Sequence, residues 1–373
     1  AIEKDNPKLE GIVERSYAAS KLPVDKLGQV VDLIGQISFD GGRREASDIL
    51  GQVYEYFLGK FANAEGKLGG QFYTTPSIVK TIVEVLKPTK GRVYDPACGS
   101  GGMFVQSEKF AEAHGGRLGD ISIYGQESNP TTRRLCAMNL AIRGIEFNLG
   151  KTAVSTFKDD QHKDTKFDYI MMNPPFGKNA SYPKKDLLDD VRWKKYGIPR
   201  EKPANYAWLS HAIHHLAPKG RAGIVMPRGA VTSDQDTDGK IRSAFLDDDI
   251  VECIIDLPGQ LFFNVQIPAT LWKNDRNNQV LMIDARKMGS PISSTQIEFS
   301  TEEIERIGNT FEAWANGKYE DIDWYCKSVS RDEIKKKGDV LSPGRYIGTE
   351  ALLGDEPLPL KETLPALTTT INE

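Results

Sequence analysis

The stretch Phe167-Asp-Tyr-Ile-Met-Met-Asn-Pro-Pro-Phe176 joins an apolar run to a stiff polar turn. Its first six residues have the length and composition of a buried strand. Open α/β sheets bind ligands beyond the carboxyl ends of such strands, so we expect the last four residues at the edge of a crevice. Pro174 and Pro175 remove two backbone donors and restrict φ, which leaves the Asn173 side-chain oxygen and the Pro174 carbonyl as rigid acceptors.

This turn suits an exocyclic amine. Such an amine offers two N–H donors, which Asn173 and Pro174 can accept, and Phe176 supplies a flat face for an aromatic ring. A Pro-Pro pair after a strand is often only the exit into a loop. The functional interpretation therefore depends on a second motif, about seventy residues upstream.

That motif is Asp95-Pro-Ala-Cys-Gly-Ser-Gly-Gly102, which follows a predicted strand and begins a predicted helix. Its glycines permit a tight turn and let a ligand approach the backbone closely. Dinucleotide enzymes use a related loop, but their Gly-x-Gly-x-x-Gly spacing is absent here, as is the Gly-Lys-Ser/Thr of triphosphate sites. We therefore predict a compact ligand without phosphates, bound by the loop residues Ala97, Gly99, Ser100 and Gly101.

Three carboxylates complete the predicted cofactor site. Glu127 follows the predicted strand Ile121–Gly125, where a carboxylate can accept hydrogen bonds from two vicinal ribose hydroxyls, with Ser128 beside it. Asp95 ends the preceding strand and is placed to receive an ammonium group of the ligand. Asp160 lies in the loop before residue 167 and is placed to receive an adenine amine.

From Arg92 onward, predicted strands and helices alternate, which indicates a mostly parallel sheet covered on both faces. We expect a doubly wound, Rossmann-like α/β domain over residues 65–289. Residues 1–64 are predicted as the end of a helical domain, and residues 290–373 as a helical and loop extension with a role in subunit docking. The strands at Pro268–Trp272 and Val280–Asp284 are predicted to form a hairpin.

The net charge of −4 argues against a surface that attracts nucleic acid as a whole. One basic segment, Lys178 to Lys202, carries eight Lys or Arg residues against four acids. A charge run is often just a solvated loop, but this one begins two residues after Phe176, which favours substrate contact. We assign contacts with a nucleic acid to Lys184, Lys185, Lys194 and Lys195.

The sequence has no run of eighteen apolar residues and no charged-then-apolar leader, so we expect no membrane contact. The four cysteines are scattered without paired spacing, which argues against a zinc site and favours a reducing cytoplasm. No metal is predicted. Because the first residue is Ala and not Met, we expect the chain to be a fragment of a longer one.

Seven motifs follow one another along the chain: Gly70–Pro76, Asp95–Gly102, Gly125–Pro130, Met138–Gly144, Asn173–Phe176, Leu257–Pro268 and Leu341–Ile347. Together they resemble the modification (methyltransferase) subunit of type I restriction-modification systems. The resemblance implies a class I methyltransferase fold, S-adenosylmethionine as methyl donor and adenine N6 in double-stranded DNA as acceptor, so the four lysines assigned above would contact DNA. It also implies assembly with a specificity subunit and a restriction subunit, and places Phe72, Tyr73 and Thr74 beside the methionine part of the cofactor.

Reaching an amine inside a duplex requires extruding the base, and stacking on Phe176 with Phe262 or Phe263 opposite would stabilise it. Packing in the core is the alternative role for Phe262 and Phe263. Three other functions stay open: methylation of RNA guanine, methylation of a protein glutamine, and an inactive scaffold that only bridges subunits. A dinucleotide oxidoreductase is disfavoured by the spacing of the glycine loop.

Overall fold

The computed structural model describes residues 74–176, 180–232, 236–259, 261, 268–272, 278–293 and 296–347, together with a few positions before residue 57. For residues 236 and 268–272 the backbone alone is described. The predicted site residues Phe72, Tyr73, Phe262 and Phe263 lie outside the described residues.

A mostly parallel sheet of nine strands, in the order β11-β8-β6-β7-β5-β4-β1-β2-β3, organises the described chain. The pairs β1·β2, β1·β4, β2·β3, β4·β5 and β6·β8 are parallel, as the alternation of strands and helices predicts. The strands are β1 (Gly91–Asp95), β2 (Ile121–Gly125), β3 (Phe147–Asn148), β4 (Phe167–Met172), β5 (Leu216–Val225), β6 (Val251–Asp256), β7 (Pro268–Trp272), β8 (Gln279–Asp284) and β11 (Cys326–Ser330). A separate two-stranded sheet pairs β9 (Ser290–Ser293) with β10 (Gln296–Glu298).

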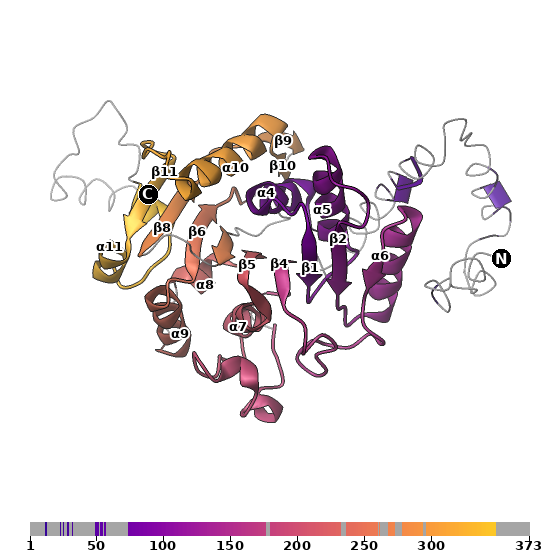
Figure 1. Cartoon of the computed structure of the whole chain (residues 1–373), viewed down its shortest axis with the longest axis horizontal. Helices are drawn as coiled ribbons and strands as arrows, with labels where there is room; N and C mark the ends of the chain where they lie inside the picture. Colours follow the sequence, from indigo (N-terminus) through magenta and orange to yellow (C-terminus); the bar gives the residue numbers. More distant parts are fainter. Residues whose placement is uncertain are drawn as a thin grey trace, which may run out of the picture.

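Helices cover both faces of this sheet (Figure 1). On one face lie α4 (Pro76–Leu86), α5 (Gly102–Ala113), α6 (Pro130–Ile142) and α10 (Thr301–Ala315). On the other lie α7 (Asn205–His215) and α9 (Asp236–Asp247), and shorter helices complete the chain: η3 (Lys184–Leu187), η4 (Val191–Trp193), α8 (Arg228–Thr232), α11 (Arg331–Lys336) and η5 (Pro343–Arg345).

Two hydrophobic cores result, one on each face of the sheet. Successive strand residues alternate between them: Val93 and Met171 belong to the first core, whereas Tyr94 and Ile170 belong to the second. Because side chains point to opposite faces along a strand, a strand buried on both sides reads as a continuous apolar run. The run before Asn173 is such a strand, and it lies at the centre of the sheet.

The predicted hairpin of β7 and β8 is wrong. β7 lies between β5 and β6 and is antiparallel to both. β8 lies on the other side of β6 and pairs with β6 in parallel. The two strands are close in sequence, but the sheet inserts β6 between them. The local sequence does not indicate that β6 lies between β7 and β8, because this order depends on how β7 pairs with β5 and β6, which come earlier in the chain.

Residues after 289 contribute a strand to the central sheet. β11 joins the edge of the same sheet, antiparallel to β8, and α10 packs against α4 beside it. Residues 290–347 therefore complete the central fold as far as they are described. Within the described residues, no helix combines the length and the apolar character that a membrane crossing requires.

Candidate active site

A cavity of about 510 Å³ lies at the carboxyl ends of β1, β2 and β4. Five of its lining residues were predicted from the sequence: Ala97, Glu127, Ser128, Asn173 and Pro175. The sequence analysis did not assign the others, which are Pro96, Asn129, Pro130, Ser155, Thr156, Phe157, Ala180, Ser181 and Trp208. This volume lies within the usual range of small-molecule sites, about 300–1,000 Å³.

One side of the cavity, which we call the glycine wall, consists of residues 96–102 and 127–130. Its turn is fixed by backbone hydrogen bonds from Cys98 N to the Gln126 oxygen (3.0 Å) and from Gly101 N to the Cys98 oxygen (2.9 Å). Gly101 has φ +84°, and a Cβ atom there would lie 2.8 Å from the Cys136 sulfur. Only glycine fits this position without strain. Gly99, Ser100 and Gly101 thus shape the turn, but their atoms do not line the cavity.

Glu127 links the two segments of the glycine wall by hydrogen bonds. Its Oε2 accepts a hydrogen bond from Gly99 N (3.1 Å), and its Oε1 accepts from Asn129 N (2.8 Å) and the Ser128 hydroxyl (3.3 Å). Asn129 in turn caps α6, since its Oδ1 accepts from the backbone N–H groups of Thr131 and Thr132. A carboxylate oxygen accepts more than one hydrogen bond, so Glu127 retains capacity for a ligand.

Asp95 supports this wall from inside the protein. It is 2% exposed, and its Oδ1 accepts a hydrogen bond from Ala97 N (2.9 Å). Burial raises the pKa of this carboxyl well above its ordinary value, although the Ala97 hydrogen bond acts in the opposite direction. Asp95 is absent from the cavity lining. Its observed contact is with the turn, and its predicted contact with an ammonium group stays a prediction.

The opposite side, which we call the loop wall, consists of residues 154–162 between β3 and β4. Gln126 donates from Nε2 to the carbonyl oxygens of Val154 (3.1 Å) and Asp159 (2.6 Å), and its Oε1 accepts from Gln161 N (3.3 Å). The Thr156 hydroxyl donates to the Pro96 oxygen (2.6 Å), which links the two walls. The ring centroid of Phe157 lies 4.4 Å from that of Trp208 on α7, and both residues contribute to the cavity lining although they are only 2% and 7% exposed.

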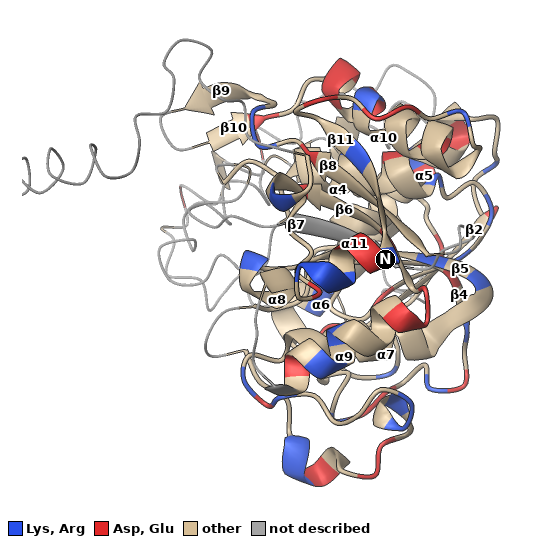
Figure 2. Cartoon of the chain, turned by 90° about the vertical axis from the view of Figure 1, so that its left-hand side faces the viewer, with Lys and Arg blue, Asp and Glu red and all other residues tan. Residues whose placement is uncertain are grey.

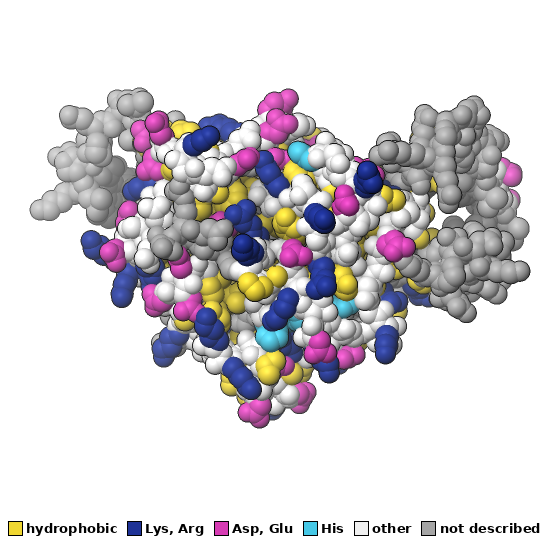
Figure 3. Space-filling model, in the orientation of Figure 1, with side chains coloured by type: hydrophobic (Ala, Val, Ile, Leu, Met, Phe, Trp, Pro, Cys, Tyr) yellow, Lys and Arg dark blue, Asp and Glu magenta, His cyan; other side chains and the backbone are white. Residues whose placement is uncertain are grey.

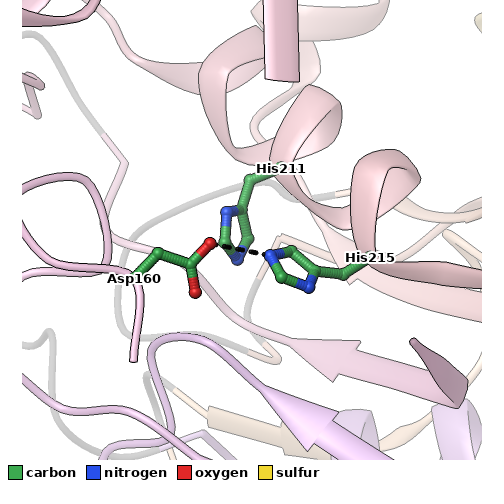
Figure 4. A group of neighbouring side chains, drawn as sticks. All are labelled: Asp160, His211 and His215. Carbon is green, nitrogen blue, oxygen red and sulfur yellow. Dashed lines mark hydrogen bonds and ion pairs between the residues drawn. The ribbon is translucent and has the colours of Figure 1, made fainter. Parts of the chain in front are cut away.

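Asp160 belongs to the loop wall but is absent from the cavity lining. Its Oδ1 accepts from His162 N (3.1 Å) and its Oδ2 lies 2.9 Å from His215 Nε2. His211 joins this group one helical turn before His215 (Figure 4). The observed contacts of this carboxylate are with histidines, and its predicted contact with an adenine amine stays a prediction.

Asn173 lies between the two walls. Its Nδ2 donates to the Thr74 hydroxyl (3.1 Å), and its Oδ1 is buried without a hydrogen-bond partner among the described residues. A buried acceptor without a partner is costly unless something else binds it, so this oxygen is available to a donor from outside the chain. Pro174 is buried, Pro175 is exposed and lines the cavity, and Phe176 is half-buried against the core.

The basic segment after β4 is less available than its composition suggests. Tyr182 and Trp193 are each 2% exposed and belong to the core. Arg192 is buried and forms a two-pronged ion pair with Asp190, while Lys195 pairs with Asp248 at 2.5 Å. Lys185 and Lys194 are exposed and Lys184 is half-buried.

Basic and acidic side chains are interspersed on the face that Figure 3 shows. Figure 2 shows short blue and red stretches alternating around the chain, without one continuous basic face in that view. The four predicted DNA contacts, Lys184, Lys185, Lys194 and Lys195, therefore make a local patch at most. Because Lys195 pairs with Asp248, its positive charge contributes less to that patch.

The chain matches the family model described as N-6 DNA methylase over residues 45–355. It is 45% identical to the type I restriction enzyme HindI methylase subunit of Haemophilus influenzae, with 100% of this chain and 86% of that protein covered. It is 39% identical to the MjaIX methylase subunit of Methanocaldococcus jannaschii, with 96% of this chain but 66% of that protein covered.

Solved structures agree with these sequence relatives. The type I restriction-modification methyltransferase subunit of Streptococcus thermophilus superposes with a TM-score of 0.78 at 26% identity, covering 93% of this chain and 75% of that one. The EcoKI M protein superposes with a TM-score of 0.62 at 21% identity, covering 83% and 72% of the two chains, which supports the fold.

Proposed function

The chain belongs to the N-6 DNA methylase family, and from that premise we propose that it transfers a methyl group to the N6 amine of adenine in DNA, as the modification subunit of a type I restriction-modification complex. The observation that carries the proposal is the buried, unpartnered Oδ1 of Asn173 at the edge of a cavity of about 510 Å³. An acceptor at this place is what an extruded amine requires.

S-adenosylmethionine is the proposed methyl donor, and its sulfonium group makes the methyl carbon electrophilic when it is bound. The residues of the cavity fit such a molecule. Glu127 offers carboxylate oxygens for ribose hydroxyls, and Phe157 and Trp208 are the large apolar residues of the cavity lining. The glycine wall lets the ligand approach the backbone closely.

Asn173 acts on the acceptor amine. The lone pair of an adenine amine is conjugated into the ring, which makes the nitrogen a poor nucleophile. Hydrogen bonds from its two N–H groups to Asn173 Oδ1 and the Pro174 carbonyl favour a tetrahedral nitrogen, whose lone pair then points at the methyl carbon. Holding both reactants in this geometry lowers the barrier by several kcal/mol without an acid or base of special pKa.

Thr74 fixes the direction of the Asn173 amide. By accepting from Nδ2, the Thr74 hydroxyl leaves Oδ1 as the group that faces the amine. Phe176 and, outside the described residues, Phe262 and Phe263 are the proposed stacking partners of the extruded base. Lys184, Lys185 and Lys194 contribute a weak basic patch, so most of the affinity for double-stranded DNA comes from the proposed specificity subunit, with a restriction subunit as the further partner.

The decisive test compares Asn173→Ala with Glu127→Ala in a complex with the specificity subunit. Asn173→Ala should lower methyl transfer by about a thousandfold while S-adenosylmethionine binds within a few-fold of the wild type. Glu127→Ala should do the reverse, weakening binding by about a hundredfold. Binding is measured by calorimetry and transfer by incorporation of labelled methyl groups into duplex DNA.

Glu320→Ala removes an exposed carboxylate far along the chain and serves as the matched control for Glu127→Ala. Full activity of Asn173→Ala would contradict the proposed mechanism. Labelled methyl groups found in RNA or in a protein glutamine, but not in DNA, would contradict the substrate. Failure of the wild type to bind S-adenosylmethionine would contradict the proposed function and support the alternative of an inactive scaffold.

A further inference from the structure

The loop wall is held from behind by a buried polar cluster. Asp160 pairs with His215 on α7, and His162 Nε2 lies 3.0 Å from the Gly125 oxygen at the end of β2. From η4, Arg192 Nη1 donates to the Thr156 oxygen (3.2 Å). His162 is 4% exposed, and His211 and His215 are 0% exposed, so three of the five histidines of the chain lie buried behind this wall.

The two ring nitrogens of His215 both face acceptors. Nδ1 lies 3.0 Å from the backbone oxygen of Thr165, and Nε2 lies 2.9 Å from Asp160 Oδ2. A neutral imidazole carries one N–H, so both contacts are hydrogen bonds only when the pair holds an extra proton, as an imidazolium beside a carboxylate. Burial by itself would raise the pKa of Asp160, but the hydrogen bond and charge of His215 outweigh burial and lower it.

His211 differs from His215 although it lies one turn away. Its Nδ1 lies 3.2 Å from the Arg192 guanidinium, which can only donate, and its Nε2 lies 3.2 Å from the Tyr94 hydroxyl. Burial, then the nearby His215 and Arg192, lower the pKa of His211 well below its ordinary value. His211 is therefore neutral and accepts a hydrogen bond from Arg192.

The donor atoms of Asp160, His211 and His215 lie within 4.8 Å of one another, a spacing that a metal ion could bridge. Two observations oppose that interpretation. Both nitrogens of His211 are already engaged, and the Arg192 guanidinium beside it would repel a cation. The contacts of His215 with Asp160 and Thr165, and those of His211 with Arg192 and Tyr94, engage both histidines without a metal.

We propose that Asp160 and His215 form a proton-dependent latch that positions the loop wall and thereby sets the affinity of the cavity for S-adenosylmethionine. Neither residue lines the cavity. Asp160 lies three residues after Phe157, and His215 ends the helix that carries Trp208, so the pair fixes the two rings relative to each other. The inference rests on the proposed function, because it takes S-adenosylmethionine as the ligand of the cavity.

The sign of the pH dependence follows from the hydrogen bonds. When the pair loses its proton, one ring nitrogen of His215 presents a lone pair to an oxygen, and the latch is lost. Affinity should therefore fall as the pH rises, and binding at alkaline pH should take up a proton. The charged and titratable groups around His215 are Asp160 and His162 from the loop, Tyr94 from β1, Arg192 from η4, and His211 and His214 from α7.

The test compares His215→Gln, Asp160→Asn and the double variant with the wild type by calorimetry between pH 5.5 and 9. Each single substitution should raise the Kd for S-adenosylmethionine about tenfold at neutral pH and remove the alkaline loss of affinity. The double variant should be no weaker than the weaker single variant, because both substitutions break the same pair. For His215→Gln, methyl transfer at saturating S-adenosylmethionine should stay within twofold of the wild type.

His214→Gln is the matched control. His214 is the preceding histidine of α7, and burial with the nearby Lys166 lowers its pKa to about 4, so it is neutral throughout this pH range. Its substitution should change neither the Kd nor the pH profile. A wild-type Kd and pH profile in His215→Gln would overturn the proposal, and so would stoichiometric zinc bound to the purified wild type.

A second measurement uses the wild type alone and does not depend on how the variants fold. Binding of 5′-methylthioadenosine, which lacks the amino-acid part and its titrating amine, is measured in buffers of different ionisation enthalpy. Proton uptake at alkaline pH supports the latch, and its absence overturns it. If the wild type binds neither nucleoside, the proposed function fails; if it binds both without proton uptake, only the latch fails.

Discussion

The two walls of the cavity are held in different ways. Backbone hydrogen bonds, together with the carboxylates of Asp95 and Glu127, fix most of the glycine wall from within its own two segments. Asn139 and Thr156 each add one hydrogen bond from outside, to the Ser100 and Pro96 oxygens. The loop wall depends on side chains from three other elements, with Gln126 after β2, Arg192 in η4 and His215 in α7. The conformation of a local turn can be predicted from its own sequence, whereas the position of a wall held by distant side chains cannot.

The difference extends to chemistry. The glycine wall is held by backbone N–H groups that donate to side-chain and backbone oxygens. The loop wall is held in part by a histidine and a carboxylate, whose bond depends on a proton. The two sides of one binding site therefore differ in the kind of donor that holds them.

The largest effect is expected at Gln126, the main support of the loop wall. Gln126→Ala removes three hydrogen bonds and leaves the Val154 and Asp159 oxygens without their partner, so the free energy of unfolding should fall by about 3 kcal/mol. Chemical denaturation measures this change. Gln106→Ala, the same truncation on α5, should cost less than 1 kcal/mol. Equal losses in the two variants would contradict the role of Gln126.

A smaller effect is expected in the glycine wall. Gly101→Ala introduces a Cβ atom 2.8 Å from the Cys136 sulfur at φ +84°, so the free energy of unfolding should fall by about 2 kcal/mol. The next residue supplies the control, because a Cβ atom on Gly102 would meet nothing within 4 Å. Thermal unfolding that ranks the two variants in the opposite order would show that the turn is not as tight as described.

The smallest effect is expected at Thr74, between the walls. Thr74→Val removes the acceptor of the Asn173 Nδ2 hydrogen bond, which should raise the barrier by about 1 kcal/mol and lower kcat about fivefold. The Kd for S-adenosylmethionine should change less than kcat. Thr74→Ser keeps the hydroxyl and should retain most of the activity, so equal losses in both variants would argue against orientation of the amide.

The sequence predicted what depends on neighbouring residues. The glycine turn, the strand before Asn173 and the position of Glu127 follow from local spacing, and the structure places Ala97, Glu127, Ser128, Asn173 and Pro175 around one cavity. The mostly parallel sheet also follows from the alternation of strands and helices. Each of these inferences uses only residues that lie a few positions apart.

What the sequence did not predict depends on contacts between distant segments. Phe157 and Trp208 are ordinary apolar residues in their local sequence, and only the fold brings their rings together. The contact between Asp160 and His215 likewise joins residues 55 positions apart. The spacing of His211 and His215, one turn apart on a helix, was the one local signal that these histidines share a neighbour.

The insertion of β7 between β5 and β6 has a consequence for how the chain is made. On the ribosome, β5 and β6 emerge before β7, the strand that pairs with both of them, so each is made without that partner. The strands β1 to β5 pair with one another and need β7 only along one side of β5, so all other pairings of their side of the sheet are available before residues 268–272 emerge. During synthesis, the half of the sheet that carries Asn173 therefore precedes the half that closes its edge.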